Sequence, residues 1–384
     1  MSSTGSKAGA LGAIPGGLLG MLGLLLAIEG FVARNALDFS DPVSLSWRLA
    51  ARGAREEAPA SRVLCIGDSL VKHGVLPRLV EAETGLPTVN LAVARGPAPA
   101  TYFLLRRALE AGAKPAAVVV DYKPSVLIGN LTYNLRYWQE IASARELWEL
   151  ALESRKGSFL TAVVLGRLLP SYRARLEIRS NLREALRGES PLLGRINRVC
   201  ARNWRANAGA NVATRNPSFR GEVGPDEHKL LHSHLYYCER INAEYVRRLL
   251  ALTKARGIPV YWLLPPLSPQ LQARREQTGA EAGYLQLASA SLTANPHLTI
   301  LDGRHSGYGP EVFVDATHLD SQGASALSLD VAAVLRRDLG VVGGAGVPAR
   351  PRPRWVDLPR YRDAPSAIAL EDVEQSRTIL KIAR

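Results

Sequence analysis

Cysteine is scarce in this chain of 384 residues, which contains only three, at Cys65, Cys200 and Cys238. No two of them form a Cys-x-x-Cys pair, so their spacing excludes a disulfide framework and a four-cysteine zinc site. Cys65 lies in an apolar run, and we expect it to be a small buried hydrophobic residue. Charged residues are also few, at 22%, against 47% hydrophobic residues. This composition excludes a disordered chain and predicts a globular protein.

Acidic residues are outnumbered, since 48 Lys and Arg against 35 Asp and Glu give a net charge of +13. Such an excess suggests nucleic acid, an anionic membrane or an acidic glycan as a partner. The segment 131–215 alone contains 15 basic and 7 acidic residues, and no nucleic-acid-binding motif accompanies it. We therefore predict no nucleic-acid partner, and either a solvated basic face or one that rests on anionic lipid head groups.

Charge is absent from residues 8–28, a stretch that would form a helix of about 31 Å, close to the thickness of a bilayer core. We predict a short N-terminal tail at 1–7 and a transmembrane signal-anchor at 8–33. A cleaved signal peptide is the alternative, because Pro15 and six glycines weaken the first half of the helix. Basic residues flank the stretch on both sides, so charge does not decide its orientation.

Short apolar runs alternate with helical patterns after a predicted stalk with one weak helix at 34–60. This alternation predicts an α/β fold with a parallel sheet covered on both faces. The five expected strands lie within 63–66, 88–93, 116–120, 258–264 and 298–301. We expect one domain from 61–128 and 226–340, interrupted by a basic helical insertion, or cap, at 129–225. A Pro/Arg-rich extension at 341–384, expected to be disordered in its Pro-rich part, ends the chain.

Two short motifs could carry chemistry. Gly67-Asp68-Ser69-Leu70 follows the first predicted strand, and ligands of open parallel sheets bind at the carboxyl ends of strands. Asp315 and His318 lie after the last predicted strand, spaced so that the carboxylate can hold one imidazole nitrogen while the other accepts a proton from a serine. Alone, each motif is as well explained by a turn that caps a helix. Together they supply the nucleophile, base and acid that an activated serine requires.

These motifs resemble those of SGNH, or GDSL-type, hydrolases. Residues 67–70 match the block that contains the nucleophile, residues 315–319 match the block that contains the acid and base, and residues 90–96 are similar to the second block. The resemblance implies a three-layer α/β/α, flavodoxin-like fold with a five-stranded parallel sheet and a Ser69, His318, Asp315 triad. It also implies that the Ser69 and Gly96 N–H groups contribute to the oxyanion hole, and that no metal or other cofactor is needed.

The third block departs from the family pattern. Its usual Gly-x-Asn-Asp is replaced by the run from Val119 to Pro124, with no asparagine in register. Losing one oxyanion donor typically costs about 2.7–4 kcal/mol of transition-state stabilisation. Lys123, Tyr122 or Asn130 are the candidates for a substitute donor.

The same departure resembles membrane-anchored envelope proteins of this superfamily that take part in O-acetylation of exopolysaccharides or D-alanylation of teichoic acids. That resemblance implies an extracytoplasmic esterase or acyltransferase that acts on acyl esters of a polysaccharide. It also suggests a membrane acyltransferase as a partner. The alternative is a catalytically silent relative that binds glycan or scaffolds such a partner, and the missing asparagine motivates it.

Overall fold

The sheet is parallel throughout and has six strands, in the order β2-β1-β3-β4-β5-β6. The computed structural model describes residues 16–34, 41–173, 175–188, 193–224, 227, 238–340 and 353–364. The strands are β1 Val63–Ile66, β2 Thr88–Asn90, β3 Ala117–Val120, β4 Val260–Leu264, β5 Leu298–Asp302 and β6 Trp355–Asp357. The predicted α/β class and parallel sheet are therefore confirmed, and the order of the first five strands is that of flavodoxin-like sheets.

Alternating side chains of each strand enter two separate hydrophobic cores. Leu64 and Ile66 of β1 belong to one cluster, whereas Val63 and Cys65 belong to the other. Successive side chains of a strand point to opposite faces, so a sheet whose strands are apolar throughout must be covered on both sides. Cys65 is completely buried, as predicted, and burial raises the pKa of its thiol to about 12.

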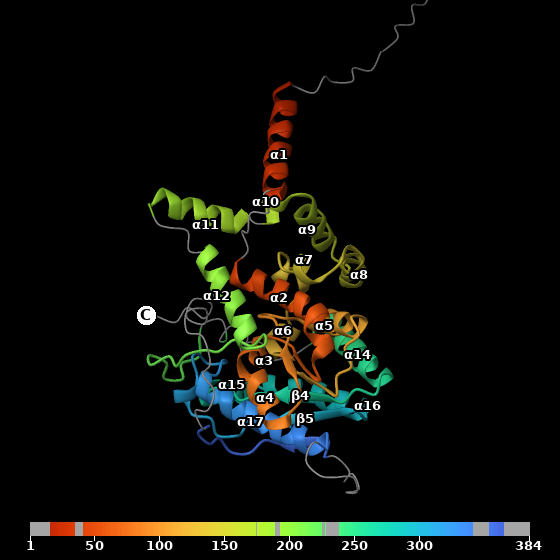
Figure 1. Cartoon of the computed structure of the whole chain (residues 1–384), viewed down its shortest axis with the longest axis vertical. Coiled ribbons are helices and arrows are strands. Elements are labelled where there is room, and N and C mark those ends of the chain that lie inside the picture. Colours follow the sequence, from red (N-terminus) through yellow and green to blue (C-terminus); the bar gives the residue numbers. More distant parts are fainter. Residues whose placement is uncertain are drawn as a thin grey trace, which may run out of the picture.

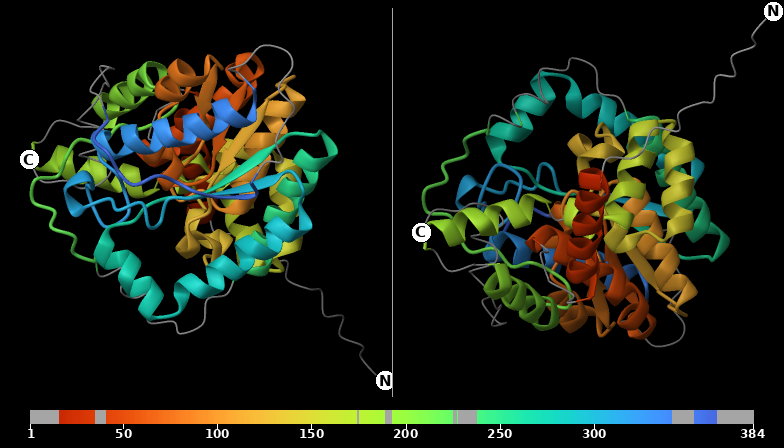
Figure 2. Two further views of the ribbon diagram at one scale, coloured as in Figure 1. Left: turned by 90° about the horizontal axis from the view of Figure 1, so that it is seen from below. Right: turned by 90° about the horizontal axis from the view of Figure 1, so that it is seen from above.

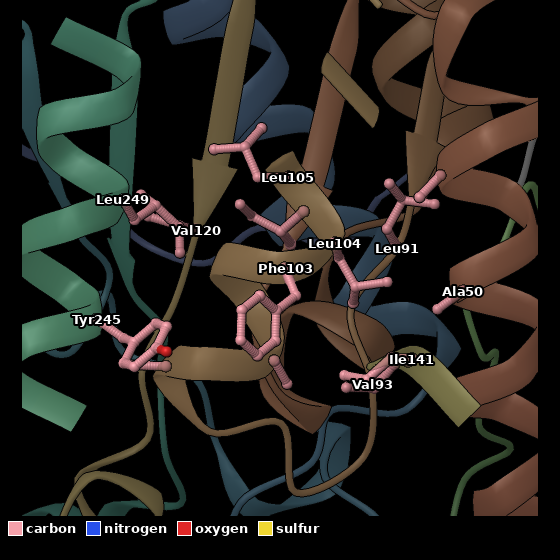
Figure 3. Packing of buried hydrophobic residues seen from close by; sticks show 14 of the residues in the cluster. Ala50, Leu91, Val93, Phe103, Leu104, Leu105, Val120, Ile141, Tyr245 and Leu249 are labelled. Carbon is pink, nitrogen blue, oxygen red and sulfur yellow. The ribbon is translucent and has the colours of Figure 1, made fainter. Parts of the chain in front are cut away.

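Helices cover both faces of the sheet, as Figure 2 shows for α17 and α16 on its opposite sides. The first cluster contains residues of α2 Pro42–Glu56, α5 Ala98–Glu110, α7 Trp138–Ile141, α8 Ala144–Ser154, α14 Arg240–Ala255 and α16 Ala280–Ala294. The second contains residues of α3 Ser69–Gly74, α4 Pro77–Thr84 and α17 Ser321–Asp338. In the first cluster Phe103 of α5 packs against Tyr245 of α14, with ring centroids 5.5 Å apart (Figure 3).

The predicted stalk at 34–60 is wrong in its second half, because α2 is part of the core. Asp41 caps this helix by accepting the Ser44 N–H at 2.7 Å, and Pro42 occupies its first turn. Trp47 is completely buried, and its indole N–H donates to the Ala94 carbonyl at 3.0 Å. The helix therefore anchors the loop that follows β2.

The C-terminal extension also contributes to the fold, contrary to the expectation of disorder at 353–359. Strand β6 pairs in parallel with β5 and adds an edge to the sheet. The Ile300 N–H donates to the Arg354 carbonyl at 2.8 Å, and Leu358 is buried in the second cluster. Residues 341–352 and 365–384 of this extension lie outside the described residues.

The insertion at 129–225 is mostly helical, as expected. It contains η2 Leu131–Asn134, α7, α8, α9 Gly157–Leu168, α10 Pro170–Arg173, α11 Arg175–Leu186 and α12 Leu193–Ala206. Its last part returns to the sheet, where the Asn90 N–H of β2 donates to the Ala208 carbonyl at 2.8 Å. Ala210 and Val212 are buried in the second cluster. The insertion is therefore more than a cap.

Helix α1, Gly16–Arg34, projects from the body of the molecule (Figure 1). Its large apolar side chains are exposed, for example Leu24 at 62% and Met21 at 64%. At its base Glu29 accepts hydrogen bonds from the Ser171 N–H and hydroxyl of α10. Within the described ranges, no helix has both the length and the apolar character needed to cross a membrane. Residues 8–15 of the predicted anchor lie outside those ranges.

Candidate active site

The candidate nucleophile lies on the turn between β1 and α3. Gly67 adopts φ 135°, and a Cβ there would lie 1.9 Å from Asp121 Oδ1, so the turn requires glycine. Asp68 caps α3 by accepting the Leu70 N–H at 2.8 Å. Ser69 is the first residue of the helix and is partly exposed. Its N–H forms no hydrogen bond with any described residue.

The candidate acid and base lie on the loop between η3 Pro310–Val312 and α17. An antiparallel bridge between Phe313 and Leu319 closes this loop. Asp315 Oδ1 accepts the N–H groups of Thr317 and His318, both at 2.8 Å. Because two backbone donors fix one carboxylate oxygen, the other is held in a defined direction.

The structure brings Ser69, His318 and Asp315 together. His318 Nε2 lies 2.8 Å from Ser69 Oγ, and His318 Nδ1 lies 2.7 Å from Asp315 Oδ2. Both distances are within the range for hydrogen bonds between a serine, its general base and the orienting carboxylate. With Nδ1 donating to Asp315, Nε2 is left to accept the Ser69 proton.

The environment of Asp315 keeps it ionised. Desolvation by itself raises the pKa of the carboxyl group, but the charge of His318 and the hydrogen bonds from the His318 ring and two backbone N–H groups outweigh it. The net effect holds the pKa of Asp315 below its usual range. A carboxylate that stays charged can stabilise the imidazolium that forms when His318 accepts a proton.

Two buried basic residues beside the triad were not predicted from the sequence. The His73 ring packs edge-to-face on His318, with centroids 5.1 Å apart, and is 1% exposed. Burial lowers the pKa of His73 well below its usual value, and the nearby His318 and Lys72 lower it further. Their positions three and four residues after Ser69, on one face of α3, are the sequence signal that could have revealed them.

Lys72 is 1% exposed and forms no ion pair with a carboxylate of the described residues. Its Nζ donates to the Ala92 carbonyl at 3.0 Å and to the Gly209 carbonyl at 2.8 Å. Burial lowers the pKa of Lys72 to about 7. This side chain therefore ties α3 to the loop after β2 and to the end of the insertion.

Gly96 and Asn130, two of the residues expected at the oxyanion hole, form local hydrogen bonds. Gly96 lies against the nucleophile turn, where a Cβ would be 2.6 Å from the Gly67 carbonyl, but its N–H already donates to the Val93 carbonyl at 2.9 Å. Asn130 uses its side-chain oxygen to cap η2, accepting the Thr132 N–H at 2.9 Å. Of the two donors expected from the resemblance, Ser69 N–H and Gly96 N–H, only that of Ser69 has no acceptor among the described residues.

The other two candidate substitutes make contacts through the Tyr122 ring and the Lys123 backbone, and the buried Tyr122 hydroxyl has no hydrogen-bond partner among the described residues. Tyr122 is 2% exposed and packs on Trp262 in the first core cluster, with ring centroids 5.1 Å apart. The Lys123 backbone N–H donates to Asp68 Oδ2 at 2.8 Å. The residue that follows β3, Asp121, accepts the Asp68 N–H at 2.9 Å. The third block thus supports the nucleophile turn from below.

Comparisons with models of known protein families and with curated protein sequences both returned no match. The chemistry of the site therefore has to be argued from its geometry. A serine hydroxyl that is hydrogen-bonded to an imidazole, which a carboxylate orients, can attack the carbonyl carbon of an acyl compound and form a covalent acyl intermediate.

Proposed function

We propose that this protein is a serine esterase or O-acyltransferase. It would remove an acyl group from an ester of envelope polysaccharide or a similar substrate, or transfer the acyl group to a sugar hydroxyl. The observation that carries the proposal is the continuous hydrogen-bonded chain from Ser69 Oγ through His318 to Asp315, with distances of 2.8 and 2.7 Å. Ser69 and His318, whose side chains meet in this chain of hydrogen bonds, are 249 positions apart in the sequence. The alternative function of this motif, capping the following helix, explains Asp68, but it does not explain why His318 forms a hydrogen bond with Ser69.

In the proposed reaction, Ser69 Oγ attacks the ester carbonyl carbon while its proton passes to His318 Nε2. The C–O bond to the leaving alcohol then breaks, and His318 returns the proton to that oxygen. Water or a sugar hydroxyl next gives its proton to His318 and attacks the acyl-Ser69 carbonyl, which releases Ser69 and an acid or a new ester. Asp315 remains ionised and stabilises the imidazolium in both halves of the cycle.

We also propose that residues 8–33 anchor the chain in a membrane, with the catalytic domain outside the cytoplasm, where polysaccharide esters are found. The support is the absence of charge at 8–28 and the exposed apolar side chains of α1. A membrane acyltransferase would then be a partner of this chain in the same membrane. This part of the proposal is independent of the triad geometry.

A silent relative is the second candidate, and one observation favours it. The family asparagine is missing, and the Gly96 N–H is engaged in its own turn. Loss of each donor costs roughly 10²- to 10³-fold in rate, so an enzyme that lacks both and keeps the Ser69 N–H is expected to be slow.

Labelling with a fluorophosphonate separates the two candidates, because the probe reacts only with an activated serine. We would label the full chain in detergent and locate the adduct by intact mass and peptide mapping. The expected result is an adduct on Ser69 that is lost in Ser69→Ala and His318→Ala but kept in the exposed controls Ser289→Ala and His297→Ala. No adduct on folded protein would favour the silent, glycan-binding or scaffolding function.

A further inference from the structure

Two carboxyl groups lie completely buried beneath the nucleophile turn. Asp68 and Asp121 are both 0% exposed. Strands β1 and β3 pair in register, with Ile66 opposite Val120, so the residues that follow them meet at the same edge of the sheet. Asp121 stands in the block where the resemblance leads one to expect an oxyanion asparagine.

The hydrogen bonds around the two carboxyl groups are unequal. Asp68 accepts two backbone N–H groups, from Leu70 and Lys123, both at 2.8 Å. Asp121 Oδ1 accepts the Asp68 N–H at 2.9 Å, but no N–H or hydroxyl group of the described residues donates to the buried Oδ2. An ionised carboxylate oxygen is not left without a donor in a buried site, and two adjacent carboxylates disfavour each other's charge.

We propose that Asp121 is a positioning residue that acts as a neutral carboxylic acid, whose Oδ1 holds the Asp68 N–H and so fixes the turn that presents Ser69 to His318. The proton removes the charge that would otherwise face Asp68, and it lets the Asp121 carboxyl group donate a side-chain hydrogen bond to Asp68. Close approach of Gly67 to Asp121 Oδ1, which leaves no room for a Cβ, shows how tightly the turn is seated on this group. Burial first, and the charge of Asp68 second, raise the pKa of Asp121 well above its usual value.

Two substitutions test the positioning role, which rests on Ser69 being the nucleophile of the proposed function. Asp121→Asn keeps an acceptor for the Asp68 N–H and is uncharged, so we expect fluorophosphonate labelling of Ser69 close to that of the wild type. Asp121→Leu keeps a side chain that branches at Cγ, although a larger one, but has no acceptor, and we expect labelling at least about tenfold slower. A folded Asp121→Asn variant that no longer labels, or an Asp121→Leu variant that labels like the wild type, would overturn the proposal.

The pH dependence of unfolding tests the neutral state without requiring a reactive serine. A carboxyl group whose pKa is higher in the folded chain than in the unfolded chain stabilises the fold fully below about pH 4, and this contribution is lost as the pH rises to the folded pKa. Each pH unit in that window changes the unfolding equilibrium constant by up to about tenfold. Asp121→Asn removes this dependence.

The other ionisable groups near the turn are present in both proteins. They are Asp68, Lys72, His73, Tyr122, Lys123, Cys238, Asp315 and His318. The comparison therefore reports the titration of Asp121 together with that of Asp68, the carboxyl group that interacts with it.

Urea unfolding of the full chain would therefore be followed at pH 5, 6 and 7 for the wild type, Asp121→Asn and the exposed control Asp357→Asn. We expect the stability of the Asp121→Asn variant relative to the wild type to increase with pH, and that of the control to stay constant. Parallel curves for wild type and Asp121→Asn would show that Asp121 is a carboxylate and overturn the proposal. If the wild type takes no probe, the proposed function fails, but the unfolding curves still decide the state of Asp121.

Discussion

Replacing Asp315 by asparagine should abolish most of the reactivity of Ser69, for a reason that follows from the hydrogen bonds of the loop. Asp315 Oδ1 accepts the N–H groups of Thr317 and His318, both at 2.8 Å. An asparagine must direct its oxygen to the same two donors, which leaves its NH₂ group opposite His318 Nδ1. That nitrogen must then accept a hydrogen bond, so the ring proton moves to Nε2.

A proton on Nε2 prevents His318 from acting as a base, because this nitrogen faces Ser69 Oγ at 2.8 Å. The wrong tautomer in an otherwise intact serine triad costs about 10⁴ in rate, which corresponds to roughly 5.5 kcal/mol of activation free energy. We therefore expect the rate of fluorophosphonate labelling of Asp315→Asn to fall by about three to four orders of magnitude.

The assay is a time course of labelling, read by intact mass, on the full chain in detergent. Asp357→Asn, which changes an exposed aspartate of β6, controls for the loss of one negative charge. Thermal unfolding establishes that the loop variant is folded. Labelling of a folded Asp315→Asn variant within tenfold of the wild-type rate would refute the assignment of Asp315 as the orienting acid.

Three further substitutions test the surroundings of the triad. Burial lowers the pKa of Lys72 from 10.5 to about 7, so the free energy of unfolding should rise between pH 7 and pH 10.5, by up to about 1.4 kcal/mol per pH unit. Lys72→Met should remove that slope in urea unfolding at pH 7, 8 and 9. An unchanged slope would contradict the lowered pKa of Lys72. His73→Phe preserves the ring contact with His318, so labelling should stay near the wild-type rate, whereas a large loss would reveal a proton-transfer role. Gly67→Ala puts a Cβ 1.9 Å from Asp121 Oδ1, on a residue with φ 135°. Thermal unfolding should show a destabilisation of about 2 kcal/mol or more, and Ser69 should no longer be labelled. An alanine variant as stable and reactive as the wild type would show that the turn is not fixed as described.

The sequence predicted the five central strands because their signal is local. Runs such as Val63–Ile66 and Ala117–Val120 are apolar throughout and bounded by turns, which is typical of strands buried on both faces. The Asp315 and His318 pair could also be identified, since both residues lie in one turn. What the sequence did not contain was the distance to Ser69, which depends on how β1 and the loop before α17 meet at the edge of the sheet.

The errors concern elements whose structure depends on distant partners. Strand β6 has three residues between Pro- and Arg-rich flanks, and it exists because β5 offers it a free edge. In α2, the arginines at 48, 52 and 55 obscured how much of the helix is buried, including Leu45, Trp47 and Leu49. Asp121 was interpreted only as a missing asparagine, because its role depends on Asp68, which no local pattern connects to it.

The end of the insertion shows why a division of this chain at residue 225 misrepresents the active site. Segment 208–213 binds three parts of the catalytic framework by hydrogen bonds at 2.7–2.9 Å. The Ala208 carbonyl accepts from β2, the Gly209 carbonyl accepts from Lys72, and the Ala213 carbonyl accepts the Ser321 N–H that follows the His318 loop. Leaving a buried partner unpaired costs about 1–3 kcal/mol for each group. Removal of 129–225 as one unit would therefore loosen the supports of Ser69 and His318 together, so the boundary between cap and catalytic framework belongs near residue 207.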